Sequence, residues 1–233
     1  MSIAENVRTV REKMNAAALA AGRKPEEILL VAATKMNSAD RVREAVAAGV
    51  DVCGENRVQE LLEKQAQGAY AGVPLHFIGH LQKNKVRQIV GLAELIHGVD
   101  SLALLEVIQR CAAGKGLVQD VLLEVNIGAE ESKSGTTPET APELVRQIAE
   151  LPHVHVKGLM CVAPIVEDPE EARPYFHRMK ELAAEIDAMG LAGVSMKELS
   201  MGMTADFEVA VEEGATFVRV GTAIFGHRDY AIQ

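Results

Sequence analysis

The chain has 233 residues, of which 48% are hydrophobic and only 3% aromatic, and a single domain over residues 1–233 is the simplest organisation. It has 24 lysine and arginine residues against 33 aspartate and glutamate residues, a net charge of −9, which argues against general nucleic-acid binding but not against a local basic pocket. Three scattered cysteines argue against a disulfide framework, and the lack of a signal peptide or of any apolar stretch near ~20 residues predicts a cytoplasmic protein without a membrane span.

The first predicted element is an amphipathic helix over residues 3–22, where Ile3, Val7 and Val10 fall on one stripe. The run from Ile28 to Lys35 is continuously apolar until its last residues and too short for a helix. It therefore predicts a strand buried on both faces, as in a parallel sheet. Ser38 is expected to cap the next helix.

The alternation of strand and helix continues to the end of the chain. Further strands are predicted over residues 50–53, 75–78, 94–99, 121–125, 154–160, at 198–200 and over 216–220. Helices are predicted over residues 56–67, 81–90, 101–113, 138–150, 170–189 and 204–213. Strands separated by helices in this number, after one extra N-terminal helix, indicate an α/β fold of the (β/α)₈ TIM-barrel type, with an open doubly wound sheet as the alternative.

Lys35 ends the first predicted strand, an unexpected place for a charged side chain. Burying an unpaired ammonium is costly, so its side chain is expected to reach water or to pair with a carboxylate. The alternative is an amine kept partly neutral by desolvation. Such an amine attacks carbonyl groups and forms a Schiff base.

Two glycine-containing loops follow the last two predicted strands, one beginning at Ser200 and one containing Gly221 and Thr222. Both supply hydroxyls and backbone N–H groups before a helix, as phosphate sites do, and barrels often bind phosphate at these two positions. Alternatively, the hydroxyls only cap helices and the glycines only form turns. Arg219 lies just inside the second loop and either pairs with a buried carboxylate or contacts an acceptor on a ligand.

Asn56 follows the second predicted strand and either caps its helix or contacts a ligand. The spacing of His76 and His80 is compatible with a metal, but the segment turns from strand to loop at Gly79. No HExxH pattern is present, so we expect no metal site.

A Schiff-base lysine after the first strand and a phosphate site after the last two can share one barrel mouth. A ligand with an aldehyde at one end and a phosphate at the other would satisfy both. Pyridoxal 5′-phosphate (PLP) is such a molecule.

Motifs from the first strand to the last resemble the pyridoxal phosphate homeostasis protein family. The matching stretches are VAATK (31–35), GENRVQE (54–60), HFIGHLQKNK (76–85), GLM (158–160), LSMGMTADF (199–207) and RVGTAIFG (219–226). The resemblance implies the barrel of the fold type III PLP enzymes and a largely monomeric protein. It also implies a role in intracellular vitamin B6 homeostasis, in which the cofactor is sequestered or delivered to PLP-requiring apo-enzymes, without a settled catalytic activity.

The resemblance also implies roles for individual residues. Lys35 would carry PLP as an aldimine. Ser200, Gly221 and Thr222 would hold the phosphate. Arg219 would face the pyridine nitrogen and Asn56 would line the pocket.

Two enzymes are the competing interpretations. An amino-acid racemase of this fold carries a second domain and a catalytic tyrosine. Here only residues 227–233 follow the last loop, and Tyr70, Tyr175 and Tyr230 do not stand at strand ends. A cofactor-free aldolase would use a Schiff-base lysine and a phosphate site in a colourless protein, an interpretation that the family motifs disfavour.

Overall fold

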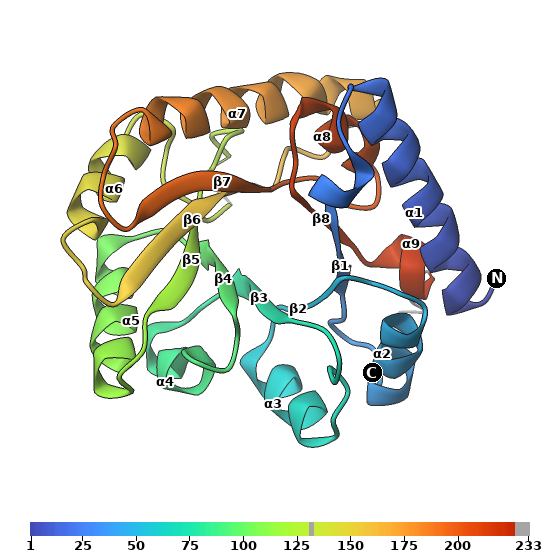
Figure 1. Ribbon diagram of the computed structural model, residues 1–233, viewed down its shortest axis with the longest axis horizontal. Coiled ribbons are helices and arrows are strands. Elements are labelled where there is room, and N and C mark those ends of the chain that lie inside the picture. Colours follow the sequence, from blue (N-terminus) through green and yellow to red (C-terminus); the bar gives the residue numbers. More distant parts are fainter. Residues whose placement is uncertain (131–132, 227–233) are drawn as a thin grey trace.

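The structure, a computed structural model, describes residues 1–130 and 133–226 and is a closed barrel in which each strand pairs in parallel with its neighbours (Figure 1). The strands are β1 (Leu29–Ala33), β2 (Val52–Glu55), β3 (Leu75–His80), β4 (Leu95–Val99), β5 (Gln119–Glu124), β6 (Val154–Met160), β7 (Val194–Ser200) and β8 (Phe217–Val220). β8 pairs with β1 and closes the ring. The predicted (β/α)₈ barrel is therefore confirmed.

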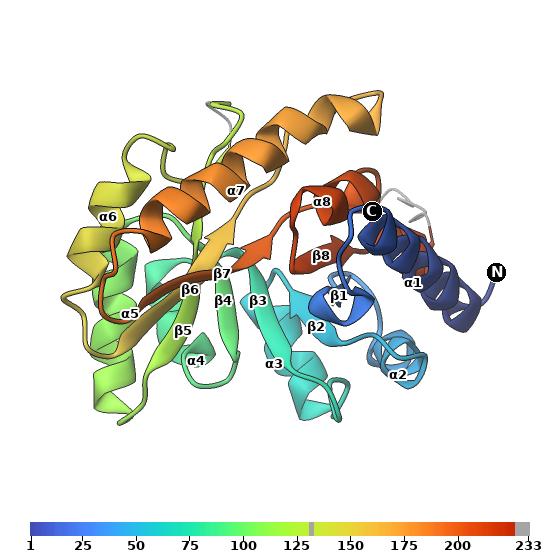
Figure 2. The same ribbon diagram turned by 45° about the horizontal axis from the view of Figure 1, so that its top comes forward.

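The helices lie outside the ring of strands, which Figure 2 shows in a turned view. They are α1 (Ile3–Ala20), α2 (Ala39–Ala47), α3 (Val58–Ala66), α4 (Val86–Ile89), α5 (Leu102–Gly114), α6 (Ala141–Ile148), α7 (Arg173–Asp187), α8 (Phe207–Glu213) and α9 (Thr222–Phe225). Short 3-10 helices precede β1, α4 and α7, namely η1 (Pro25–Glu27), η2 (Lys83–Lys85) and η3 (Pro169–Ala172). In the described part of the chain, no helix is both long enough and apolar enough to cross a membrane.

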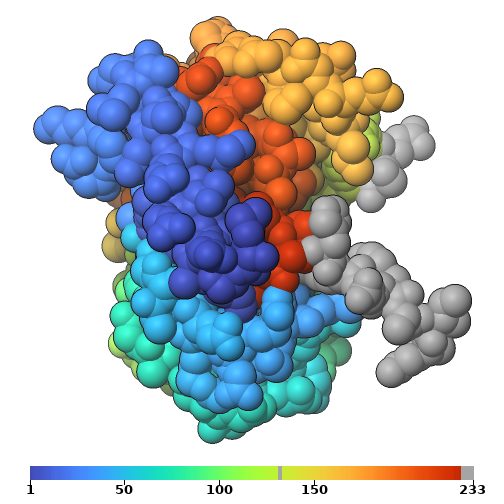
Figure 3. All heavy atoms as spheres, turned by 90° about the vertical axis from the view of Figure 1, so that its right-hand side faces the viewer, coloured from blue at the N-terminus to red at the C-terminus, as the bar shows by residue number. Residues whose placement is uncertain are grey.

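The extra N-terminal helix, α1, covers the seam where the barrel closes. Its buried stripe includes Ile3, Val7 and Val10, as predicted, and Ser2 and Glu5 form a capping box at its start. The side-chain amide of Asn6 donates a hydrogen bond to the carbonyl oxygen of Ile224, 2.8 Å away. Figure 3 shows α1, in dark blue, lying against the red residues that end the described chain.

Several predicted helix starts are wrong. The helix expected from residue 81 begins only at Val86, after the 3-10 helix η2. The helix expected from Pro138 begins at Ala141, because a second proline, Pro142, takes the first-turn position that proline favours. The helix expected from Thr204 begins at Phe207. Its N-cap residue is Asp206, whose side chain accepts a hydrogen bond from the backbone N–H of Met203, 2.6 Å away.

Alternating side chains of each strand divide the core into two parts. The larger part lies between the strands and the helices. The smaller part fills the barrel and consists of Val31, Val52, Leu95, Leu122, Met160 and Phe217. Because these six side chains face the interior, the alternation along each strand shows which way the other strand residues point. By the same alternation His76, His97, Ser200 and Arg219 face the interior, whereas Thr34 and Glu55 face α3.

Candidate functional site

The residues singled out in the sequence gather toward one end of the barrel. They are Lys35, Asn56, Ser200, Arg219, Gly221 and Thr222. All the strands are parallel, so their carboxyl ends open onto the same mouth. Because β8 pairs with β1, the loop after β8 lies beside Lys35 at this mouth.

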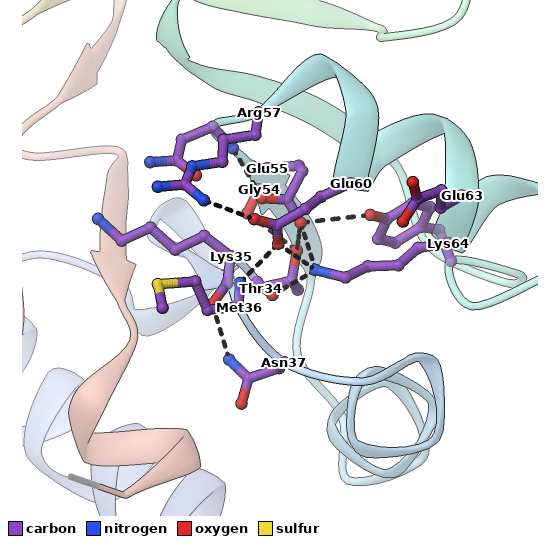
Figure 4. A network of polar contacts seen from close by, with 12 residues as sticks. Thr34, Lys35, Met36, Asn37, Gly54, Glu55, Arg57, Glu60, Glu63 and Lys64 are labelled. Carbon is purple, nitrogen blue, oxygen red and sulfur yellow. Dashed lines mark hydrogen bonds and ion pairs between the residues drawn. The ribbon is translucent and has the colours of Figure 1, made fainter. Parts of the chain in front are cut away.

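Lys35 is half-buried and follows β1 two residues after its last residue, Ala33. In Figure 4 its side chain extends away from a buried ionic cluster formed by Glu55, Glu60 and Lys64. The amine therefore extends toward the barrel mouth. The cluster lies on the opposite side of the Lys35 backbone, between the barrel wall and α3.

The loop after β8 approaches β1 closely. A Cβ atom on Gly221 would lie 3.4 Å from the Cβ of Ala33, at van der Waals contact, so the loop packs against the end of β1. Thr222 is partly exposed and begins α9. The loop after β7 also contacts β8. Its Gly202 has φ +87°, a left-handed conformation that favours glycine. The carbonyl oxygen of Gly202 accepts a hydrogen bond from the backbone N–H of Arg219.

Arg219 is buried in the barrel interior with only 6% of its surface exposed. Its guanidinium donates hydrogen bonds to the hydroxyl of Ser200, 2.6 Å away, and to the carbonyl oxygen of Cys161, 2.7 Å away. Among residues 1–130 and 133–226, no carboxylate is paired with it. The alternative that Arg219 belongs to a buried carboxylate pair is therefore wrong within the described chain. Its hydrogen bonds go to neutral acceptors, and the carboxyls of Glu124 and Asp206 act on its charge only at longer range.

The hydroxyl of Ser200 is part of a polar chain that runs along the barrel axis. It lies 2.9 Å from Nδ1 of His97, whose Nε2 lies 3.0 Å from Nδ1 of His76. Burial lowers the pKa of His76 to about 4, and burial together with the charges of His76 and Arg219 holds the pKa of His97 well below its ordinary value. Both imidazoles are therefore neutral at pH 7.

The buried histidines predict that the protein loses stability in mild acid. His76 has a pKa of about 4 in the folded protein and about 6.5 when unfolded. Between these values the unfolded state binds the extra proton, so we expect the free energy of unfolding to fall by about 3 kcal/mol from His76 alone as pH drops. Urea unfolding at a series of pH values measures this loss, which His76→Gln should reduce. His177→Gln, at a side chain 59% exposed, should leave the loss in place, and an equal effect of the two variants would contradict the assignment.

Asn56 directly follows β2, and its backbone N–H donates to Glu55 Oε1, 2.9 Å away. It does not cap α3, whose N-cap residue is Arg57. Its side-chain oxygen is buried and has no hydrogen-bond partner among the described residues. A cavity of about 320 Å³ lies beside it and is also lined by His80 and Lys85. A buried polar atom left unpaired in this way is a place where a ligand is expected to bind.

Glu124 is a residue at this mouth that the sequence analysis missed. It ends β5, and its Oε2 would lie 3.3 Å from a Cβ atom on Gly98 of β4. Burial and the nearby charge of Asp100 raise the pKa of the Glu124 carboxyl. A carboxylate at the end of a strand was a visible signal, but only the closed barrel shows that it faces the same interior as Arg219.

Comparison with known proteins identifies the family. Residues 1–229 match the family model described as alanine racemase, N-terminal domain. A pyridoxal phosphate homeostasis protein of Aquifex aeolicus is 44% identical over 230 residues, which cover 99% of this chain and 100% of the relative. This chain belongs to the pyridoxal phosphate homeostasis protein family. The resemblance seen in its motifs is thereby confirmed over the full length of the relative.

Solved structures support the same family assignment. PipY of Synechococcus elongatus PCC7942, a structure with PLP bound, has 35% identity and a TM-score of 0.83, covering 97% of this chain and 100% of that chain. An alanine racemase of Clostridium difficile has 17% identity and a TM-score of 0.74, and the match covers 58% of the racemase chain. The homeostasis protein family thus shares its barrel with alanine racemase.

Proposed function

We propose that this protein binds PLP through Lys35 and takes part in PLP homeostasis by holding and releasing the cofactor. The observation that carries the proposal is the placement of the half-buried Lys35 beside the turn after β8. The same strand, β8, contains the buried Arg219, whose hydrogen bonds go only to neutral acceptors among the described residues. The family membership and the PLP-bound structure of PipY support the same assignment.

The residues at the mouth fit PLP in charge and polarity. The buried side-chain oxygen of Asn56 has no partner among the described residues. Arg219 is a buried cation whose hydrogen bonds, among the described residues, go only to neutral acceptors. A ligand that carries negative charge and further polar groups would satisfy both, because buried polar groups and charges are stable only when they are paired.

Each residue would have a distinct task. PLP supplies an aldehyde that condenses with an amine, joining the aldehyde carbon to nitrogen and releasing water. Lys35 would provide that amine in its neutral form. The turn at Gly221 and Thr222 would donate hydrogen bonds to the phosphate, and Arg219 would donate one to the pyridine nitrogen.

For Ser200 the geometry supports a narrower task than the one implied by the resemblance. Its side chain is fully buried and already contacts Arg219 and His97. We therefore assign to Ser200 the orientation of the Arg219 guanidinium, and its contact with the phosphate stays a prediction.

The same geometry supplies no tyrosine as a second base for a racemase in the described part of the chain. Arginine remains protonated, so Arg219 would leave the ring nitrogen of PLP without a proton and make PLP a weaker electron sink. This effect does not distinguish a binding protein from a racemase, because alanine racemases of this fold type also have arginine there. Tyr70 is buried on the outer side of the barrel beside Glu55, and Tyr175 lies in α7, so neither is placed as a second base at the mouth. Tyr230 lies outside the described residues.

The proposal is tested by titrating the purified protein with PLP and following its visible absorption. We expect a visible band at one PLP per chain, and borohydride reduction should then leave a pyridoxyl group on the peptide containing Lys35. A protein that stays colourless with PLP would contradict the proposal and favour the aldolase interpretation. Light scattering on the same sample tests the predicted monomer, and D- and L-alanine interconversion tests for racemase activity.

A further inference from the structure

A buried ionic cluster lies directly behind Lys35, between β2 and α3 (Figure 4). Nζ of Lys64 lies 2.7 Å from Oε2 of Glu55 and 3.1 Å from Oε2 of Glu60. Glu55 is completely buried, and the side chain of Lys64 is only 8% exposed. A charged group so far from water is expected to serve more than packing, because its desolvation is costly.

The cluster fixes the residue that precedes Lys35. Nζ of Lys64 donates a hydrogen bond to the carbonyl oxygen of Thr34, 2.8 Å away. The hydroxyl of Thr34 lies 3.0 Å from Oε2 of Glu55, and its backbone N–H donates to the carbonyl oxygen of Gly54. Thr34 is thus held by β2 and by the cluster, and its carbonyl oxygen also accepts the backbone N–H of Asn37.

The same cluster fixes the residue that follows Lys35. The backbone N–H of Met36 donates a hydrogen bond to Oε2 of Glu60, 2.6 Å away. Met36 has φ 59°, a left-handed conformation that residues with a side chain rarely adopt. Such a conformation persists only where the surroundings enforce it. The Glu60 carboxylate is one contact that enforces it here.

The electrostatics of Glu60 agree with this contact. Burial acts to raise its pKa, but the Met36 N–H and the ammonium of Lys64 outweigh burial, and the pKa of Glu60 is lowered. Glu60 is therefore ionised at pH 7 and is a strong acceptor for the Met36 N–H. In Figure 4 the side chain of Lys35 points away from the cluster, and the hydrogen bond of the Glu60 carboxylate is made to the backbone beside Lys35.

From this geometry we infer that Glu60, anchored by Lys64, is a positioning residue for the amine of Lys35. One ionic cluster holds the peptide groups on both sides of Lys35, and Glu60 sets the left-handed turn that aims its side chain into the mouth. The inference rests on the proposed function, because the amine that is positioned is the one assigned to PLP. Glu60 itself touches no ligand in this assignment.

The test compares Glu60→Ala with Glu60→Gln, which keeps an oxygen acceptor for the Met36 N–H. The rate at which the visible band appears with excess PLP should fall about tenfold in Glu60→Ala and recover largely in Glu60→Gln, because misplaced reacting groups lower rates steeply. Induced circular dichroism of the bound cofactor should change in the same order. Hydrogen exchange of the Met36 amide, measured without PLP, should be faster in Glu60→Ala than in wild type.

The matched control variant, Asp51→Ala, removes a contact at the start of β1, the strand that Lys35 follows. The Asp51 carboxylate accepts the backbone N–H of Leu30 at 2.7 Å and pairs with Arg11 at 2.7 Å. Asp51→Ala should lower stability but leave the capture rate and the dichroism unchanged at temperatures where the protein is folded. An equal slowing in Asp51→Ala, or unchanged capture in Glu60→Ala, would overturn the inference. A wild type that captures no PLP would instead show that the proposed function itself is wrong.

Discussion

Replacing Lys35 with alanine should abolish the visible band and the borohydride labelling, and should weaken PLP binding about a hundredfold or more. The amine is the only group assigned to a covalent bond with PLP. The remaining contacts are hydrogen bonds, each of which contributes about 1 kcal/mol net. Spectroscopic titration of the variant, followed by reduction and peptide mapping, measures both effects.

The control for this variant removes a different positive charge from the same region. Lys85 lines the cavity beside Asn56, so Lys85→Ala changes the electrostatics near the mouth without removing the assigned amine. It should retain the band at full stoichiometry. If Lys35→Ala kept the band, or if the label moved to other lysines with unchanged yield, the assignment of Lys35 would be wrong.

The strands could be predicted well because of how a parallel barrel buries them. Both faces of such a strand are covered along most of its length, so several strands, such as β1, appear as short apolar runs. The prediction for residues 154–160 matches β6 throughout although this strand contains His155 and Lys157. β7, which contains Lys197 and Glu198, was predicted only over its last residues. Helix starts are less certain because several residues compete for the same cap. Asp206, two residues after the expected Thr204, is the N-cap residue of α8, but its side chain makes no capping hydrogen bond. Its carboxylate instead accepts the Met203 N–H in the turn before the helix.

The site was predicted in part. Strand ends could be located from the sequence, and this placed Lys35, Asn56 and Gly221 at the mouth. Pairing across the closed ring could not be read from spacing, so the contact of Ser200 with Arg219 and His97 was not foreseen. These side chains meet only because β4, β7 and β8 surround one interior.

The cluster behind Lys35 left a signal in the sequence that was not used. Lys64 lies three residues after Leu61 and six after Val58, on the buried stripe of α3. A lysine on such a stripe needs a buried partner. Glu55, the last residue of β2, was the nearest acidic residue on a neighbouring element, and the structure pairs the two at 2.7 Å.

Loss of the Lys64 charge should therefore be the most destabilising single change to this cluster. Lys64→Met keeps the length of the side chain but leaves the fully buried Glu55 carboxylate without its cation and the Thr34 carbonyl without that donor. Breaking a buried ion pair in this way costs about 3–5 kcal/mol, which urea unfolding at pH 7 would measure. Lys13→Met, which breaks an exposed pair with Glu208, should cost less than about 1 kcal/mol.

The double variant Glu55→Leu/Lys64→Met separates the cost of an unpaired charge from the value of the pair. With both charges removed, most of the loss should be regained, because an apolar pair of similar volume often replaces a buried ion pair without net cost. The turn at Met36 would still lack the lysine that anchors Glu60, so PLP capture should stay slow while stability recovers. Full recovery of both stability and the rate of PLP capture would mean that the cluster acts on Lys35 only through global stability. If Lys64→Met lowered the free energy of unfolding no more than Lys13→Met, the buried pair would not be an essential contact.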